Sequence, residues 1–188
     1  MTKFILTELK DRPEGKIARV TVDNQRKLNT LNSHVIRELD EAITTLDKDT
    51  DIAVLIISGA GNKSFIGGAD ITEMAGLDPV SARSFITNMH HVCHKVRYFH
   101  APVVARVNGF CLGAGMEFAA SCDMIVACES AEFAMPEVRV GIPSVIDAAL
   151  LPRILGYNLA RELVLTGRRL GAGEAREAGL VQRLTEDD

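Results

Sequence analysis

The chain has 188 residues, of which 47% are hydrophobic and 24% charged, and its formal net charge at pH 7 is −4. This composition is typical of a globular domain with enough apolar surface to form a core. The lack of any block of like charges argues against nucleic acid or an anionic membrane as a partner. No apolar stretch approaches membrane-spanning length and the first residues do not resemble a signal or transit peptide, so we expect a cytoplasmic protein.

The first elements predicted in chain order are a hairpin and a helix. Residues 4–9 and 16–23 have the pattern of two strands, and the Pro- and Gly-containing residues 11–15 between them predict a turn. Across residues 33–48 apolar side chains recur at helical spacing, and Asn32 is the expected N-cap.

Strands and helices then alternate along the rest of the chain. The predicted elements are strand 52–58, a short helix 70–74, helix 80–98, strand 103–107, helix 116–122, strand 124–127, the strand-like residues 131–135, and mostly helical sequence after Ser144. This alternation predicts α/β layering, which on its own would suggest a doubly wound sheet. No linker divides the chain, so residues 1–188 are expected to form one domain.

The stretch from Asn108 to Glu117 joins a predicted strand to a predicted helix through a Gly-rich turn, Asn-Gly-Phe-Cys-Leu-Gly-Ala-Gly-Met-Glu. The first N–H groups of a helix are unpaired and carry partial positive charge, so this helix start suits a developing anion. Glu117 lies about one turn after Ala114, on much the same face. An acid beside an anion hole suits proton transfer next to a carbonyl, although such glycines also simply allow a helix to pack close to a strand.

Two further segments have a related character. Residues 64–71, Ser-Phe-Ile-Gly-Gly-Ala-Asp-Ile, break another apolar strand at a glycine pair before a short helix. Residues 135–143 place Glu137 directly after a proline, in a predicted loop. The two strand ends and the acids Glu117 and Glu137 would form one pocket if they converge, which sequence spacing alone does not decide.

Together and in this order, these three segments resemble the enoyl-CoA hydratase/isomerase family, also called the crotonase family. The resemblance extends from residue 17 to residue 181 and includes residues 26–32 and 165–170. It implies a crotonase-type (ClpP-like) spiral of ββα turns in place of a doubly wound sheet. It also implies a homotrimer or hexamer, and a C-terminal helical segment that is largely absent from this chain, which would make the chain a fragment.

The resemblance assigns roles to individual residues. Ala69 and Ala114 match the positions whose backbone N–H groups form the family's oxyanion hole for a thioester carbonyl, and alanine can serve at position 114 if its φ is negative. Glu117 and Glu137 match the two acids of the hydratases. The positions that match the family's coenzyme A and substrate contacts are Arg26, Leu28, Gly67, Gly68, Asp70, Ile71, Thr72 and Gly113.

One segment departs from the family pattern. Many hydratases have a Gly-rich run after the proline that corresponds to Pro143, whereas this chain continues Ser-Val-Ile-Asp from Ser144. Ser144 followed three residues later by Asp147 resembles a capping box, so a helix is expected to begin there and to run to residue 155, where its apolar face would suit a subunit interface. The larger Val145 and Ile146 are expected to alter the wall of the acyl pocket or the seat of the water.

The implied activity is hydration of a trans-2-enoyl-CoA to a 3-hydroxyacyl-CoA. Glu117 would deprotonate the attacking water and Glu137 would protonate C2, with no metal or redox cofactor because the thioester supplies the activation. The alternatives are a Δ3-Δ2 enoyl-CoA isomerase, which needs only the acid at position 137, and another crotonase-family acyl-CoA lyase. A non-catalytic or RNA-binding member is the non-enzyme alternative, although RNA binding favours a Lys-rich helix and residues 38–41 are acidic.

A metal site is not expected. His90 and His94 lie four residues apart on a predicted helix and could face the same ligand. No third ligand is apparent near them in the sequence, so a solvated helix face is the favoured interpretation.

Overall fold

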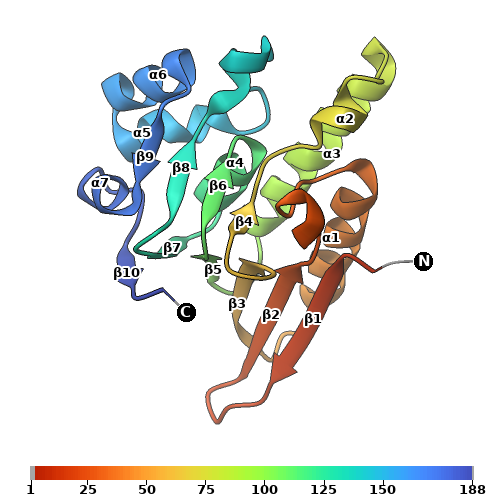
Figure 1. Ribbon diagram of the computed structural model, residues 1–188. Helices are drawn as coiled ribbons and strands as arrows, with labels where there is room; N and C mark the ends of the chain where they lie inside the picture. Colours follow the sequence, from red (N-terminus) through yellow and green to blue (C-terminus); the bar gives the residue numbers. More distant parts are fainter. Residues whose placement is uncertain (1–2, 188) are drawn as a thin grey trace.

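The computed structural model describes residues 3–187, so both ends of the expected 1–188 domain lie outside the described residues. Its elements in chain order are β1 (Ile5–Lys10), β2 (Lys16–Val22), η1 (Gln25–Lys27), α1 (Ser33–Leu46), β3 (Ile52–Gly59), β4 (Ser64–Ile66), α2 (Ile71–Met74), α3 (Pro79–Arg97), β5 (Val103–Val107), β6 (Phe110–Leu112), α4 (Ala114–Ala120), β7 (Met124–Cys128), β8 (Glu132–Ala134), η2 (Pro136–Val140), η3 (Ala148–Leu150), α5 (Leu151–Leu155), α6 (Tyr157–Thr166), β9 (Arg169–Gly171), α7 (Ala172–Glu177) and β10 (Arg183–Thr185) (Figure 1).

Within the described residues the strands form two sheets. The larger sheet has the order β1-β2-β3-β5-β7-β10 and the smaller sheet the order β4-β6-β8-β9. The predicted hairpin β1–β2 is antiparallel, as is β8–β9, whereas the remaining pairs are parallel. The apolar run of β3 suits a strand inside a parallel sheet, where both faces are covered.

The chain alternates between the two sheets, which is what a spiral of ββα turns requires. The strand pairs β3–β4, β5–β6 and β7–β8 each place the first strand in the larger sheet and the second in the smaller one. They are followed by α2 with α3, by α4, and by the single-turn η2. Figure 1 shows the smaller sheet and α4 running through the middle of the molecule, so the ends of β4, β6 and β8 lie side by side. The expected spiral is confirmed, and the doubly wound sheet is excluded.

Most predicted elements have the expected type and place. The side chain of Asn32 accepts a hydrogen bond from the N–H of Val35 at 2.8 Å, so it is the N-cap of α1. The Gly-rich stretch after β5, however, contains an extra strand, because Phe110–Leu112 form β6 between Gly109 and Gly113. Three residues between two glycines are too few to show a strand period, so this element was missed.

The helix expected from Ser144 does not form. Residues 142–147 have no regular structure, helical turns begin at Ala148, and α5 begins at Leu151. The backbone N–H groups of residues 146–148 point to the carboxylate of Glu117, which holds this segment out of a helix. The apolar residues of α5 are also directed inward, since Leu151 and Leu155 are buried against the rest of the chain.

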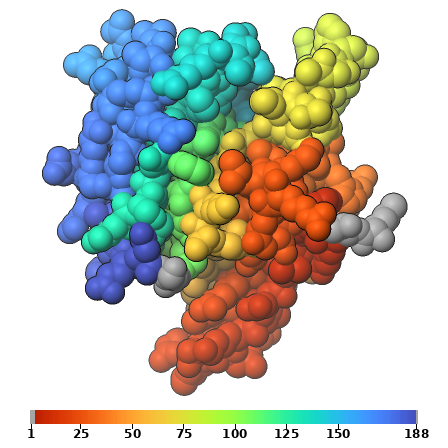
Figure 2. Space-filling view, viewed as in Figure 1, coloured from red at the N-terminus to blue at the C-terminus, as the bar shows by residue number. Residues whose placement is uncertain are grey.

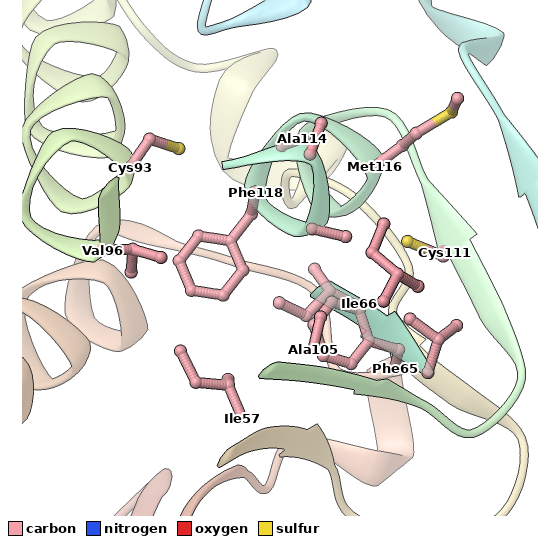
Figure 3. Packing of buried hydrophobic residues seen from close by; sticks show 14 of the residues in the cluster. Ile57, Phe65, Ile66, Cys93, Val96, Ala105, Cys111, Ala114, Met116 and Phe118 are labelled. Atoms are coloured by element: carbon pink, nitrogen blue, oxygen red, sulfur yellow. The ribbon is translucent and has the colours of Figure 1, made fainter. Parts of the chain in front are cut away.

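The core between the two sheets is apolar and continuous. Phe118 projects from α4 into its centre, toward Ile57 and toward Val96 of α3, as Figure 3 shows. Its ring lies 6.4 Å from that of Phe65 in a stacked arrangement. The burial of this face of α4 fixes where the opposite, N-terminal end of the helix lies. Among residues 3–187, no helix has both the length and the apolarity needed to cross a bilayer.

We expect Phe118→Ala to lower the free energy of unfolding by about 3–5 kcal/mol, because it removes a fully buried ring and leaves a cavity. Urea titration followed by far-UV circular dichroism measures this change. Val80→Ala, at a side chain that is 76% exposed, is the control and should change stability by less than about 1 kcal/mol. Equal effects of the two variants would show that the core is not organised around Phe118.

Candidate active site

A cavity of about 310 Å³ lies over the ends of β4, β6 and β8. In Figure 2 the yellow α2 region and the cyan region around η2 stand on either side of a hollow in the upper part of the molecule. The residues that line the cavity are Gly67, Gly68, Ala69, Ile71, Met74, Ile86, Leu112, Gly113, Ala114, Glu117, Pro136, Glu137, Arg139, Val140, Ile142, Pro143, Ser144, Val145 and Ile146. The three sequence segments therefore converge on one pocket.

Two backbone N–H groups in this cavity are free to bind a ligand. Ala69 follows β4, and Ala114 is the first residue of α4, where a helix has no internal acceptor for its N–H. Neither N–H has an acceptor within residues 3–187. Neither alanine has a positive φ, so the condition for alanine at position 114 is met. The close-packing interpretation of the glycines is confirmed at Gly115, which lets α4 pack directly on the backbone of Ile66.

Glu137 is held directly beside this helix start. It lies in η2, and a Cβ on Gly113 would clash with its Oε1 atom. Gly113 also has φ 51° and ψ −121°, which a side chain would strain. Glycine at position 113 thus allows the carboxylate of Glu137 to approach the N–H of Ala114. Burial raises the pKa of the Glu137 carboxyl above its ordinary value, and the hydroxyl of Ser144 opposes this by donating to Oε2 at 3.3 Å.

Glu117 lies in the first turn of α4 and is only 1% exposed. Its Oε1 atom accepts hydrogen bonds from the backbone N–H groups of Ile146, Asp147 and Ala148, at 3.2, 3.0 and 2.8 Å. Burial, as the main cause, and the nearby Glu137 together raise the pKa of this carboxyl from 4.5 to about 7, against the effect of the three donors. The two acids therefore influence each other's ionisation, as expected for a coupled pair.

Two of the predicted contact residues lie outside the cavity lining and serve the local structure. Asp70 is buried, caps α2 by accepting from the N–H of Thr72 at 3.0 Å, and pairs with Lys27 at 2.7 Å. The Lys27 ammonium, as the main cause, and the backbone N–H groups of Thr72 and Glu73 hold the pKa of the Asp70 carboxyl below its usual range. Thr72 itself is exposed.

Arg26 and Leu28 are exposed and lie beside the cavity rather than in it. Their loop is nevertheless attached to the Ala69 segment. The carbonyl of Leu28 accepts from the N–H of Gly67 at 2.9 Å, and residue 31 exchanges two backbone hydrogen bonds with residues 68 and 70. A ligand that reaches out of the cavity past Ala69 would meet this loop.

Some residues of the site were missed by sequence reasoning. Ser144 and Lys27 bind the predicted residues Glu137 and Asp70, and the N–H groups of residues 146–148 bind Glu117. Every non-proline residue has a backbone N–H group, so residue types do not show which of these groups binds a side chain. The one available signal was Asp147, an acid within an apolar run, which was interpreted as a helix cap.

The histidines of α3 make other contacts. His94 stacks on Tyr98 with ring centroids 4.4 Å apart, and Nδ1 of His90 lies 3.3 Å from the carbonyl oxygen of Ile146. Among residues 3–187, no group of three His, Cys, Asp or Glu side chains could hold a metal ion.

The raised pKa of Glu117 predicts a pH-dependent effect on stability. Below its ordinary pKa of 4.5 the carboxyl is neutral in the folded and the unfolded chain. Between 4.5 and about 7 the unfolded chain releases the proton while the folded chain keeps it, so folding loses stability as the pH rises through this window.

We therefore expect Glu117→Gln and the parent to have equal stability near about pH 4, and the variant to be more stable by up to about 3 kcal/mol near about pH 8.5. Gln keeps an oxygen that the three N–H groups can bind and removes the buried charge. Urea titrations across this pH range measure the difference. The exposed Glu8→Gln controls for the loss of one charge, and a parent that gains stability over Glu117→Gln with rising pH would contradict the raised pKa.

The site can be compared with known proteins. The family model of the enoyl-CoA hydratase/isomerases matches residues 12–188. The short-chain-enoyl-CoA hydratase of Clostridium acetobutylicum is 39% identical over 174 residues, which is 92% of this chain and 67% of the relative. The crotonyl-CoA hydratase of Syntrophomonas wolfei is 36% identical over 176 residues, with 93% and 68% covered.

Solved structures agree with these relatives. The crystal structure of an enoyl-CoA hydratase from Bacillus anthracis matches with a TM-score of 0.91 and 31% identity, over 98% of this chain and 70% of that chain. An enoyl-CoA hydratase from Mycobacterium smegmatis matches with a TM-score of 0.92 and 28% identity. The chain spans about two thirds of the length of the curated relatives that it matches. From its sequence and its fold, the chain belongs to the enoyl-CoA hydratase/isomerase family.

Proposed function

We propose that this protein hydrates a trans-2-enoyl-CoA to a 3-hydroxyacyl-CoA. The observation that carries the proposal is the meeting of two free backbone N–H groups, the buried acid Glu117 and the half-buried acid Glu137 in one cavity. The relatives named short-chain-enoyl-CoA hydratase and crotonyl-CoA hydratase support the same reaction and a short acyl chain.

The thioester oxygen accepts hydrogen bonds from the N–H groups of Ala69 and Ala114, which polarises the conjugated double bond. These donors are fixed before the reaction, and they stabilise the negative charge that develops on the oxygen as C3 is attacked. Loss of one such donor costs about 3 kcal/mol of barrier in comparable sites. Gly67, Gly68, Ile71 and Gly113 line the cavity around the thioester.

The two acids carry the proton transfers. Ionised Glu117 takes a proton from water, whose oxygen forms the bond to C3, and protonated Glu137 gives a proton to C2 as the double bond is lost. This division needs one proton on the pair, and burial, which raises the pKa of both carboxyls, helps the pair to keep one. The thioester supplies the activation, so the mechanism uses no metal or redox cofactor.

The coenzyme A moiety extends from the cavity past Ala69 toward the loop of Arg26 and Leu28. This loop and the Asp70–Thr72 segment are joined by backbone hydrogen bonds and by the Lys27–Asp70 ion pair. We propose that these two segments, held at a fixed separation, bind coenzyme A. Asp70 supports this arrangement by pairing with Lys27 and by capping α2.

A Δ3-Δ2 enoyl-CoA isomerase is the second candidate. One observation favours it: Oε1 of Glu117 is occupied by three backbone donors, which leaves Glu137 as the more accessible acid. An isomerase would move one proton with Glu137 alone. An assay with 2-enoyl and 3-enoyl thioesters of increasing chain length, followed by absorbance of the conjugated thioester, separates the two reactions.

The wider setting is also part of the proposal. We place one domain at residues 1–188, in a homotrimer or hexamer, with an acyl-CoA as the partner molecule and the cytoplasm as the compartment. The continuous core supports the single domain, and four free cysteines fit a reducing compartment. Exposed Tyr157 and Leu165 on α6 are compatible with a subunit contact, which sedimentation of the purified chain would measure.

We expect Glu117→Gln and Glu137→Gln each to lower the hydration rate by about a hundredfold or more, because each amide keeps the shape of the side chain but cannot transfer the proton. Steady-state assays and a circular dichroism spectrum of each variant are the measurements. Normal hydration by Glu117→Gln would exclude the two-acid mechanism and leave Glu137 as the only required acid.

Ala114→Pro should abolish turnover, since it deletes one of the two N–H donors at a helix start that tolerates proline. Ala114→Gly is the matched control, because it keeps the N–H and should keep most of the activity. A folded and active Ala114→Pro variant would remove this N–H group from the oxyanion hole.

A further inference from the structure

The segment Ser144–Ala148 contacts both acids of the site. The hydroxyl of Ser144 donates to Oε2 of Glu137 at 3.3 Å, and the backbone N–H groups of residues 146–148 donate to Oε1 of Glu117. These are residues that the helix prediction assigned to a regular element. Because they are not helical, their N–H groups are free to converge on one carboxylate oxygen.

Asp147 anchors this segment to α3. Its side chain is 7% exposed, with Oδ1 3.4 Å from Nη1 of Arg97 and Oδ2 3.6 Å from Nδ1 of His90. Both partners belong to α3, and His90 also contacts the carbonyl of Ile146. The segment is thus held between α3 on one side and Glu117 of α4 on the other.

The Asp147 contacts are not explained by stability alone. Oδ2 of Asp147 and Nε of Arg97 are buried and make no hydrogen bond within residues 3–187. A buried carboxylate with incomplete pairing is costly compared with an apolar residue of similar size. Such a feature suggests that the position of the Asp147 backbone matters more than the energy of the ion pair.

The geometry has a chemical consequence for Glu117. Three donors on Oε1 use the lone pairs of that oxygen, so Oε2 is left for a reacting water. The carboxylate is then fixed in rotation by the backbone contacts of one oxygen, at a residue that lines the cavity.

We propose that Asp147 is a positioning residue: held by Arg97 and His90, it keeps the N–H groups of Ile146, Asp147 and Ala148 on Oε1 of Glu117 and so makes Oε2 the reacting oxygen. The effect of Asp147 on the hydration rate rests on the proposed function, whereas its effect on the ionisation of Glu117 does not.

The direction in which the Glu117 pKa changes when Asp147 is removed distinguishes a positioning role from a purely electrostatic one. The groups that face Glu117 are the acid Glu137 from η2, the thiol Cys93 from α3, and Asp147 with its partners Arg97 and His90. If Asp147 acted only through its negative charge, its removal would lower the pKa of Glu117. If it acts by positioning donors that favour the anion, its removal raises that pKa.

The test uses the full chain labelled with ¹³C at the glutamate carboxyl carbons, with the Glu117 signal identified by its loss in Glu117→Gln. We expect the Glu117 pKa to be higher in Asp147→Ala than in the parent, and intermediate in Asp147→Asn, which keeps an acceptor for Arg97. With 2-enoyl thioester, kcat should fall about tenfold or more in Asp147→Ala while KM changes less than about threefold.

A second pair of variants tests the donors directly. Ala148→Pro deletes the shortest donor, at 2.8 Å, and should raise the Glu117 pKa and lower kcat. Ala149→Pro is the control at the next residue, whose N–H has no acceptor within residues 3–187, and should change neither quantity.

An unchanged or lower Glu117 pKa in folded Asp147→Ala, or in Ala148→Pro if Asp147→Ala does not fold, would overturn the proposal. A raised pKa without loss of kcat would overturn its kinetic part. Hydration by Glu117→Gln at the parent rate would reject the two-acid mechanism instead, and the carboxyl titration would still decide the role of Asp147.

Discussion

The burial of the Glu117 carboxylate is the constraint on which the site depends. A carboxyl that is 1% exposed must either stay protonated or receive hydrogen bonds. Both apply to Glu117, whose pKa is raised and whose Oε1 atom accepts three hydrogen bonds. Burial raises its pKa, while three backbone donors limit the rise. Those donors come from residues 146–148, so the need to satisfy one side chain determines the path of the chain after Pro143 and the wall of the cavity.

The same end of α4 shows how close packing and chemistry are combined. Gly115 brings the helix onto the backbone of β4, and Gly113 leaves room for Glu137. Both contacts need the absence of a Cβ atom. They set the distance between the N–H of Ala114 and the two acids, while Phe118, buried at the other end of the helix, fixes α4 in the core. The position of the site is therefore determined by the packing of one seven-residue helix.

The sequence predicted those parts of the structure that depend on local pattern. The Asn32 cap and the apolar strands lie where they were expected, because each follows from neighbouring residues. Ala69 and Ala114 were assigned through the family resemblance, and both line the cavity. The path of residues 142–147 was wrong, since a local capping pattern lost to contacts with Glu117 some 30 residues earlier and with α3 about 50 residues earlier. The Lys27–Asp70 pair was not predicted, because the two residues lie 43 positions apart and no local signal links them.

The distance along the chain between Glu117 and its donors has a consequence for how the protein is made. During synthesis α4 emerges about 30 residues before the segment that binds its carboxylate. In that interval the carboxyl can enter the apolar interior only as the neutral acid, or it must remain in water with the first turn of α4 unpacked. The arrival of residues 146–148 removes this conflict, so docking of that segment and closure of the core around α4 become a single cooperative event. Among residues 3–187, the last part of the pocket wall to be synthesised is then also the part that allows α4 to pack into the core.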